Sequence, residues 1–276
     1  MELEFILILL ALGVFGGFLS GLLGVGGGII FVPVFDFVFR QLGIQGEELV
    51  RWILANSFLA IMFSGMLSTI QHRKRGFFEF LTMLSIAIPA MISGSLVSNL
   101  IAHFEWYSDS LFKLIFISVL GFTLWRSIVK NRKEQQHHEV NRSMSLHIFI
   151  GVITGIVSAL SGLGGGVAMI PLLTLLAHRE IKEASAISIG VIPMMVIPFL
   201  VSYAIAEPVQ FPHSGLASGY LSFTSVLPVA AGIALGAPFG VRSAHRMANH
   251  RLQTIFAILL LILMLRYGVE LLLDTL

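Results

Sequence analysis

Ten apolar stretches follow one another along this chain of 276 residues, and most of them are long enough to cross a lipid bilayer as a helix. A spanning helix needs about 20 mainly apolar residues, because hydrocarbon offers its backbone no hydrogen-bond partners. Charged residues make up only 12% of the sequence, against about 25% in soluble domains. We therefore predict an all-α polytopic membrane protein and exclude a soluble enzyme, a disordered chain and a nucleic-acid binder. The stretches cover about residues 5–22, 27–40, 50–70, 77–102, 109–129, 147–161, 166–178, 184–205, 217–241 and 251–272.

Charge and cysteine content narrow the class further. The formal net charge of +2 is too small to indicate a polyanion such as nucleic acid as a partner. The sequence contains no cysteine, which excludes disulfides and thiolate ligands. His137 and His138 lie in a polar segment without matched carboxylate ligands, and we find no nucleophile–base arrangement or zinc motif. We expect no cofactor, no metal and no catalytic group.

Two glycine runs interrupt the apolar pattern. The first, Gly24-Val25-Gly26-Gly27-Gly28, separates stretch 5–22 from stretch 27–40, and the second, Gly162-Leu163-Gly164-Gly165-Gly166, separates 147–161 from 166–178. Irregular backbone at membrane depth is tolerated only inside protein or beside a water-filled cavity. A half-helix that begins after each run presents N–H groups without intrahelical partners and about half a positive charge. The runs therefore predict an anion site, although glycines that merely allow close helix packing are the competing interpretation.

The two runs belong to a sequence repeat. A shift of 138 residues places Gly13–Pro33 on Gly151–Pro171 with ten of 21 positions identical. We accordingly divide the chain into a first repeat at 1–129, a polar linker at 130–146 and a second repeat at 147–276. Further along, the alignment pairs Ala55-Asn56-Ser57 with Ala186-Ile187-Ser188, and Gly76-Phe77 with Gly219-Tyr220.

The distribution of basic residues predicts how the repeats are oriented. Lysine and arginine favour cytoplasmic loops, and they concentrate at 73–75, 130–142 and 242–251, whereas 105–109 and 207–214 contain none. This pattern fits two inverted repeats, each with a glycine-broken helical hairpin that returns to its own side and three transmembrane helices. If each broken pair instead crossed once as a continuous helix, the repeats would be parallel. The inverted arrangement places Arg40 and Arg51 on the outer side, beside Glu47 and Glu48.

Small residues at every fourth position form stripes on four segments. Such stripes allow helices to approach closely, so we expect them to pack rather than to bind a ligand. The stripes are Gly13-Gly17-Gly21, Gly151-Gly155-Ala159, Ala90-Gly94-Ser98 and Gly232-Gly236-Gly240.

Polar residues within apolar segments complete the candidate site. Their hydroxyls and amides could donate to the oxygens of an anion or bond back to their own helix. Asp36, in the first short half-helix, could be a proton site or could equally lie near the outer surface, whereas Lys113 and Glu79 are expected to reach the membrane interface. The predicted substrate-binding residues are Gly26, Gly27, Gly28, Gly164, Gly165, Gly166, Asn56, Ser57, Ser188, Ser20 and Ser158.

The paired motifs Ser20-Gly21-x-x-Gly24-Val25-Gly26-Gly27-Gly28-x-x-x-x-Pro33 and Ser158-x-x-x-Gly162-Leu163-Gly164-Gly165-Gly166-x-x-x-x-Pro171 resemble those of the TauE/SafE sulfite exporter family. The resemblance covers nearly the whole chain. It implies a multi-pass permease of the inner cell membrane that transports sulfur-containing anions such as sulfite, sulfoacetate or other organosulfonates. It also implies export or proton coupling, and a homodimer is compatible with it. Asn56 departs from the family's usual threonine or serine at that position.

We therefore predict a secondary transporter that binds a small sulfur-containing anion at two half-helix N-termini near the membrane midplane. An anion channel with the same pocket and a membrane scaffold whose glycines only pack are the alternatives. Saturation and trans-stimulation of flux would indicate a carrier, and single-channel currents would indicate a channel. Unchanged flux after substitution of the glycine runs would indicate a scaffold.

Overall fold

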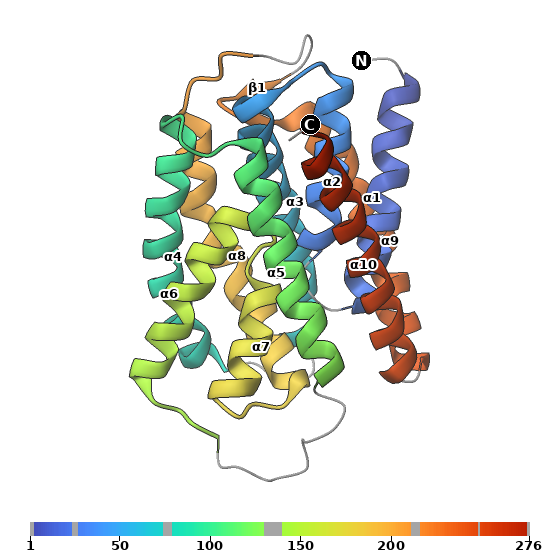
Figure 1. Ribbon diagram of the computed structural model, residues 1–276. Helices are drawn as coiled ribbons and strands as arrows, with labels where there is room; N and C mark the ends of the chain where they lie inside the picture. The colour runs from blue at the N-terminus through green and yellow to red at the C-terminus, as the bar shows by residue number, and fades with distance from the viewer. Residues whose placement is uncertain are drawn as a thin grey trace.

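The computed structural model describes residues 3–23, 27–73, 79–129, 140–210, 216–247 and 249–274 (Figure 1). Gly26 and residues 130–139 of the predicted linker, including His137 and His138, lie outside the described residues. The described part of the chain forms ten helices and one short antiparallel strand pair. The elements are α1 (Leu3–Leu23), α2 (Gly28–Gln41), α3 (Gly46–Arg73), α4 (Phe80–His103), α5 (Asp109–Val129), α6 (Met144–Ser161), α7 (Gly166–Leu176), α8 (Ile181–Ile205), β1 (Ala217–Ser218), β2 (Leu221–Ser222), α9 (Phe223–Arg246) and α10 (Asn249–Asp274).

Helix length and apolar composition confirm a multi-pass membrane protein. Within the described residues, seven helices are long and apolar enough to span a membrane: α1, α3, α4, α6, α8, α9 and α10. The most apolar windows of α3 and α8 are 83% and 72% buried, whereas that of α10 is 17% buried. Helices α3 and α8 therefore form the centre of the bundle, and α10 lies at its periphery.

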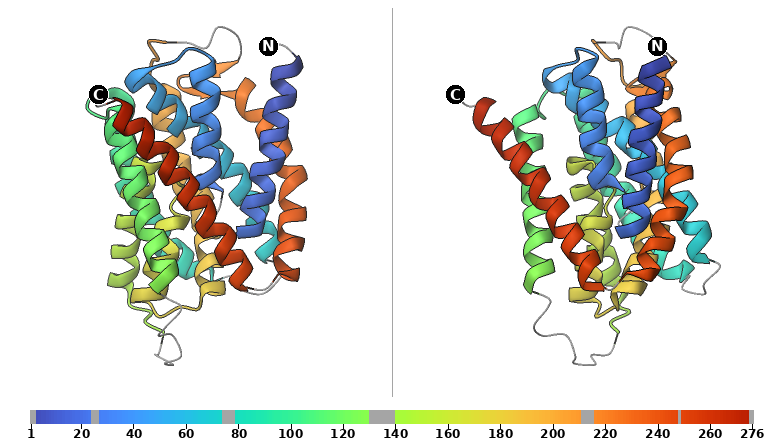
Figure 2. Two further views of the ribbon diagram at one scale, coloured as in Figure 1. Left: turned by 45° about the vertical axis from the view of Figure 1, so that its right-hand side comes forward. Right: turned by 90° about the vertical axis from the view of Figure 1, so that its right-hand side faces the viewer.

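The glycine runs separate helices that fold back on each other. The N-terminus of α1 and the C-terminal end of α2 lie at the end of the bundle that holds both chain termini (Figures 1 and 2). The start of α6 and the end of α7 lie at the opposite end. Each pair is thus a hairpin rather than one continuous helix, and the two hairpins enter the bundle from opposite ends. These directions fit inverted repeats; the symmetry between the halves stays a prediction.

The glycine stripes lie at helix contacts that join the two halves. A Cβ added to Gly13, Gly17 or Gly21 of α1 would lie 2.3–2.6 Å from the backbone of α9. On the other side of the bundle, a Cβ at Gly155 of α6 would lie 2.4 Å from the carbonyl oxygen of Ala90 in α4. The predicted packing role is confirmed at these positions, and each seam joins a helix of one half to a helix of the other.

Substitution of Gly236 tests the seam between α1 and α9. A Cβ at Gly236 would lie 2.0 Å from the backbone oxygen of Val14, so Gly236→Ala must push the helices apart. We expect a destabilisation of about 1–3 kcal/mol, the usual cost of overpacking. Thermal unfolding in detergent, followed by tryptophan fluorescence, measures it. Gly268→Ala is the matched control, because an added Cβ there would have no atom of another described segment within 4 Å. An equal melting temperature for the two variants would contradict the seam.

Candidate functional site

The two glycine runs contact each other inside the bundle. A Cβ added to Gly28, the first residue of α2, would lie 2.3 Å from the carbonyl oxygen of Leu163 in the second run. A Cβ added to Gly162 would lie 2.9 Å from the side chain of Val32 in α2. The N-terminal part of α2 and the break before α7 are therefore packed against each other. Gly28 is required here because any side chain would force the two segments apart.

Both half-helices begin at a glycine in the left-handed region. Gly27 caps α2 with φ of 85°, and Gly165 caps α7 with φ of 78°. Within the described residues, neither cap makes a side-chain hydrogen bond to the first turn. The first N–H groups of each half-helix have no intrahelical partner, which makes each start a favourable place for an anion.

Three helices surround the second break. Leu54 and Ile61 of α3 would contact a Cβ at Gly162 and Gly164, at 2.8 and 2.7 Å. Ser57 follows Leu54 by three positions and precedes Ile61 by four, so it lies on the same face of α3. The break therefore faces the helix surface that carries the Ser57 hydroxyl.

Helices α6 and α8 approach the same break through residues near Gly165. Thr154 of α6 and Met195 of α8 would lie 2.8 and 2.9 Å from a Cβ there. Ser158 follows Thr154 by four positions, and Ser188 precedes Met195 by seven, so each shares a face with the residue that contacts Gly165. Three elements thus direct hydroxyl-bearing faces toward the start of α7.

Four hydroxyls on these faces are buried without a hydrogen bond. Ser57, Thr154 and Ser158 are 0% exposed and Ser188 is 1% exposed, and none has a partner within the described part of the chain. A buried hydroxyl without a partner costs about 1–3 kcal/mol, so such a group calls for a ligand or water. Thr154 was not predicted, because the repeat alignment pairs it with Gly16 and so hides it.

The other predicted hydrogen-bonding residues already have partners. Ser20 pairs with Ser64 of α3 at 3.1 Å. Asn56 donates to the carbonyl oxygens of Trp52 and Tyr220 and accepts from the N–H of Ser222, at 2.7–2.9 Å. Both amide donors of Asn56 are therefore used, and they tie α3 to the β1–β2 turn. Of the predicted serines, Ser57, Ser158 and Ser188 have no hydroxyl partner within the described residues, and they lie on helix faces directed toward the second break.

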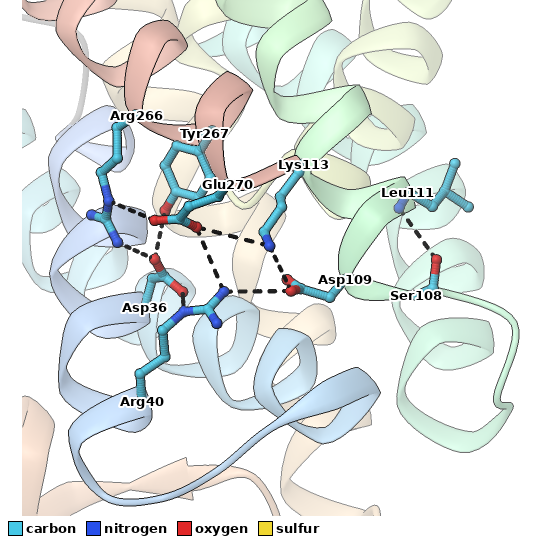
Figure 3. Close-up of polar contacts among 9 residues, drawn as sticks. All are labelled: Asp36, Arg40, Ser108, Asp109, Leu111, Lys113, Arg266, Tyr267 and Glu270. Carbon is cyan, nitrogen blue, oxygen red and sulfur yellow. Dashed lines mark hydrogen bonds and ion pairs between the residues drawn. The ribbon is translucent and has the colours of Figure 1, made fainter. Parts of the chain in front are cut away.

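Asp36 lies in a network of six charged side chains shared by α2, α5 and α10 (Figure 3). It is 0% exposed and accepts hydrogen bonds from Arg40 at 2.7 Å and from Arg266. Lys113 pairs with Asp109 at 2.8 Å and is 1% exposed, so the expectation that it reaches the interface is wrong. Its ammonium group stays inside because Asp109 lies one helical turn away. Glu270 contacts Arg40, Lys113 and Arg266, so the network contains three carboxylates and three cations (Figure 3).

The two arginines that the inverted arrangement places outside are both paired. Arg40 contacts Asp36 and Asp109, and Arg51 donates to Glu48 at 2.8 Å and to the carbonyl oxygens of Ile101 and Phe104. Their positive charge is thus balanced within the protein. Neither therefore counts against placing the end of α2 and the start of α3 on the outer side.

Broken helices that meet inside a membrane bundle, with uncapped N-termini and unpartnered hydroxyls, are the arrangement found in membrane transporters. The comparisons with known proteins agree with this class. Residues 9–267 match the family described as sulfite exporter TauE/SafE, and the chain belongs to that family.

Curated relatives cover almost the full length. A probable membrane transporter protein of Methanocaldococcus jannaschii is 29% identical over 94% of this chain and 95% of the relative. Similar probable membrane transporter proteins of Bacillus subtilis and Haemophilus influenzae are 25% and 24% identical over 93–94% of this chain and 94–96% of their own lengths. No solved structure matches the chain. The protein is a multi-pass membrane transporter.

Proposed function

We propose that this protein is a secondary transporter of the inner cell membrane that exports small sulfur-containing anions, such as sulfite, sulfoacetate or other organosulfonates. The observation that carries the proposal is the set of four buried hydroxyls around the start of α7 that have no hydrogen-bond partner in the part of the chain that the structure describes. The family's description as sulfite exporters supports the substrate class and the direction.

The chemistry of this site suits a sulfite or sulfonate group. Such a group has three oxygens that accept several hydrogen bonds, and Ser57, Thr154, Ser158 and Ser188 supply neutral donors. The start of α7 adds unpaired N–H groups and a partial positive charge. A site of neutral donors stabilises an anion without a full opposite charge, which favours the rapid release that a transporter needs. We place this site near the membrane midplane.

Flux into proteoliposomes tests the function. We expect protein-dependent uptake of labelled sulfite or of sulfonates with two or three carbons, with saturation and trans-stimulation. Single-channel currents without trans-stimulation would instead make the protein a channel. The absence of protein-dependent flux for all of these anions would contradict the proposal.

Removal of the unpartnered hydroxyls separates binding from folding. We expect Ser57→Ala and Ser188→Ala to leave the stability of the empty protein equal or raised, because each removes an unsatisfied buried hydroxyl. Each lost bond to a charged ligand should cost about 1.5–3 kcal/mol, which weakens anion binding by about tenfold or more. The readout is the rise in melting temperature at increasing sulfite or sulfonate concentration, since a ligand at about 100 times its Kd stabilises by about 2.7 kcal/mol.

Ser202→Ala is the matched control for this experiment. Ser202 is buried on α8 like Ser188, but its hydroxyl already bonds to the carbonyl oxygen of Pro198. Anion-dependent stabilisation should be preserved in this variant. If Ser57→Ala, Ser188→Ala and Ser202→Ala all respond to the anion like the parent protein, the hydroxyls do not form the site.

Proton coupling through Asp36 is part of the proposal. Asp36 lies on α2, whose start is packed against the second break, and its carboxylate faces Arg40 on its own helix and Arg266 on α10. Protonation would remove the negative charge that holds α2 to α10. A proton bound here would therefore loosen a half-helix that contacts the anion site.

A further inference from the structure

Each end of the bundle contains a polar tie between the two halves. At the end opposite the termini, Arg179 in the corner between α7 and α8 binds Glu79, which directly precedes α4. At the end that holds the termini, Glu48 in the first turn of α3 binds Tyr220, which lies in the β1–β2 turn shortly before α9. The two ties are built alike. In each, the loop region that follows a half-helix (α2 or α7) of one repeat contacts the segment before a long helix (α9 or α4) of the other repeat.

The tie between Arg179 and Glu79 is a forked ion pair. The two terminal nitrogens of Arg179 donate to the two carboxylate oxygens of Glu79 at 2.6 and 2.8 Å. The Arg179 side chain is 1% exposed, whereas that of Glu79 is 41% exposed. Hydrogen bonds from Arg179 hold the pKa of Glu79 below its ordinary value, so Glu79 is ionised near neutral pH. This tie therefore breaks by movement of its two segments rather than by titration.

The tie at the other end is more extensive. Glu48 accepts hydrogen bonds from Arg51 and from the Tyr220 hydroxyl at 2.8 and 2.7 Å, and from the N–H groups of Val209 and Gln210. Burial, followed by the hydrogen bond to Glu48, raises the pKa of Tyr220 to about 12, so the hydroxyl stays a donor. Asn56, about two helical turns further along α3, donates to the carbonyl oxygen of Tyr220 and accepts from the N–H of Ser222.

The repeat alignment relates the two ties. The offset that pairs Ser57 with Ser188 also pairs Glu48 with Arg179, and the offset that pairs Gly76 with Gly219 pairs Glu79 with Ser222. The two corner residues, Glu48 and Arg179, thus occupy matching places, one acidic and one basic. Glu79 matches Ser222, two residues beyond Tyr220, so the other two partners lie in corresponding segments but not at the same position. Sequence comparison of the copies does not reveal this, because the paired residues are of unlike type.

We propose that these ties are the latches of two gates, and that opening the anion site toward the face with the basic loops requires the Glu79–Arg179 latch to break while the Glu48–Tyr220 latch stays closed. Helices α3 and α8 carry Ser57 and Ser188. Access to these serines from one end requires the start of α3 to separate from the segment before α9, and access from the other end requires the segment before α8 to separate from the start of α4. Alternating access by inverted repeats is rocking of one bundle against the other about such a site. This inference rests on the proposed function.

The lack of cysteine makes a direct test available. In the full-length protein, Ser188→Cys supplies a single thiol at a position that is 1% exposed with both latches formed. A membrane-impermeant thiol reagent is applied separately to each face of oriented vesicles. Adding Glu79→Gln should raise the labelling rate several-fold from the basic-loop face and leave it unchanged or lower from the opposite face. Adding Glu48→Gln should do the reverse.

An exchange of charges completes the test. Glu79→Arg combined with Arg179→Glu should return labelling to the slow rate of the parent, because the ion pair is restored. A labelling rate that Glu79→Gln leaves unaltered, or that rises equally from both faces, would overturn the latch. Labelling needs no substrate, so a face-specific rise in a protein that transports no sulfur anion would reject the proposed substrate and keep the latch.

Discussion

Alanine at Gly28 is expected to abolish anion flux. The added Cβ would lie 2.3 Å from the carbonyl oxygen of Leu163 and 2.4 Å from its carbonyl carbon, and backbone atoms cannot move aside as a flexible side chain can. The start of α2 and the second break must therefore separate, which displaces the start of α7 from the hydroxyls of α3, α6 and α8. Misplacement by about 1 Å is enough to reduce the activity of a preorganised site about 100-fold. Flux in proteoliposomes and anion-dependent thermal stabilisation should both be lost.

Gly28→Ala tests the contact between the two breaks alone, whereas substitution of Gly27 or Gly165 would not. Gly27 and Gly165 have φ of 85° and 78°, so any side chain there strains the backbone as well as the packing. Gly28 lies within helix α2, where alanine is otherwise favoured. Gly121→Ala provides the control, because within the described residues its Cβ would meet only the terminal methyl of Met264, at an ordinary contact distance of 3.4 Å. If Gly28→Ala transports at the rate of Gly121→Ala, contact between the two breaks is not needed for function.

Neutralising Asp36 is expected to have the second large effect. Asp36→Asn keeps the shape of the side chain but leaves three cations against two anions in the network of Figure 3. Breaking a fully buried ion pair costs about 3–5 kcal/mol. Since the side chains of Arg40 and Arg266 are 36% and 35% exposed, solvent screening should reduce the loss to about 2–3 kcal/mol. Denaturation in detergent measures this loss of stability.

A second substitution distinguishes a structural role of Asp36 from proton coupling. Asp36→Asn combined with Arg266→Gln restores equal numbers of charges and should recover most of the lost stability, because a neutral pair replaces an ion pair at similar volume. If Asp36 carries the coupled proton, flux in this double variant should no longer respond to an imposed pH gradient, although the anion still binds. A recovered response to the gradient would show that Asp36 only stabilises the fold.

Regular patterns along the chain were enough to predict the helices of this fold, although not the β1–β2 pair, which lies within the apolar stretch 217–241. Apolar stretches of about 20 residues predict membrane-spanning helices, and the glycine runs favour breaks between helices, because each conclusion follows from residues close in sequence. The repeat of the runs predicted two hairpins, and their directions in the bundle fit the predicted inversion. The glycine stripes correctly indicated close packing.

The partners of these elements were decided only by the tertiary structure. Nothing local in the sequence states that α1 packs on α9 of the other half, that Arg266 reaches Asp36 across 230 positions, or that Asn56 is occupied by the β1–β2 turn. For the same reason, the sequence could not distinguish Ser20 from its repeat counterpart Ser158, although the Ser20 hydroxyl is bonded to Ser64 and the Ser158 hydroxyl has no partner within the described residues. Whether a buried hydroxyl is free to bind a ligand depends on which distant segment lies against it, and the repeat pattern of a chain carries no information about that contact.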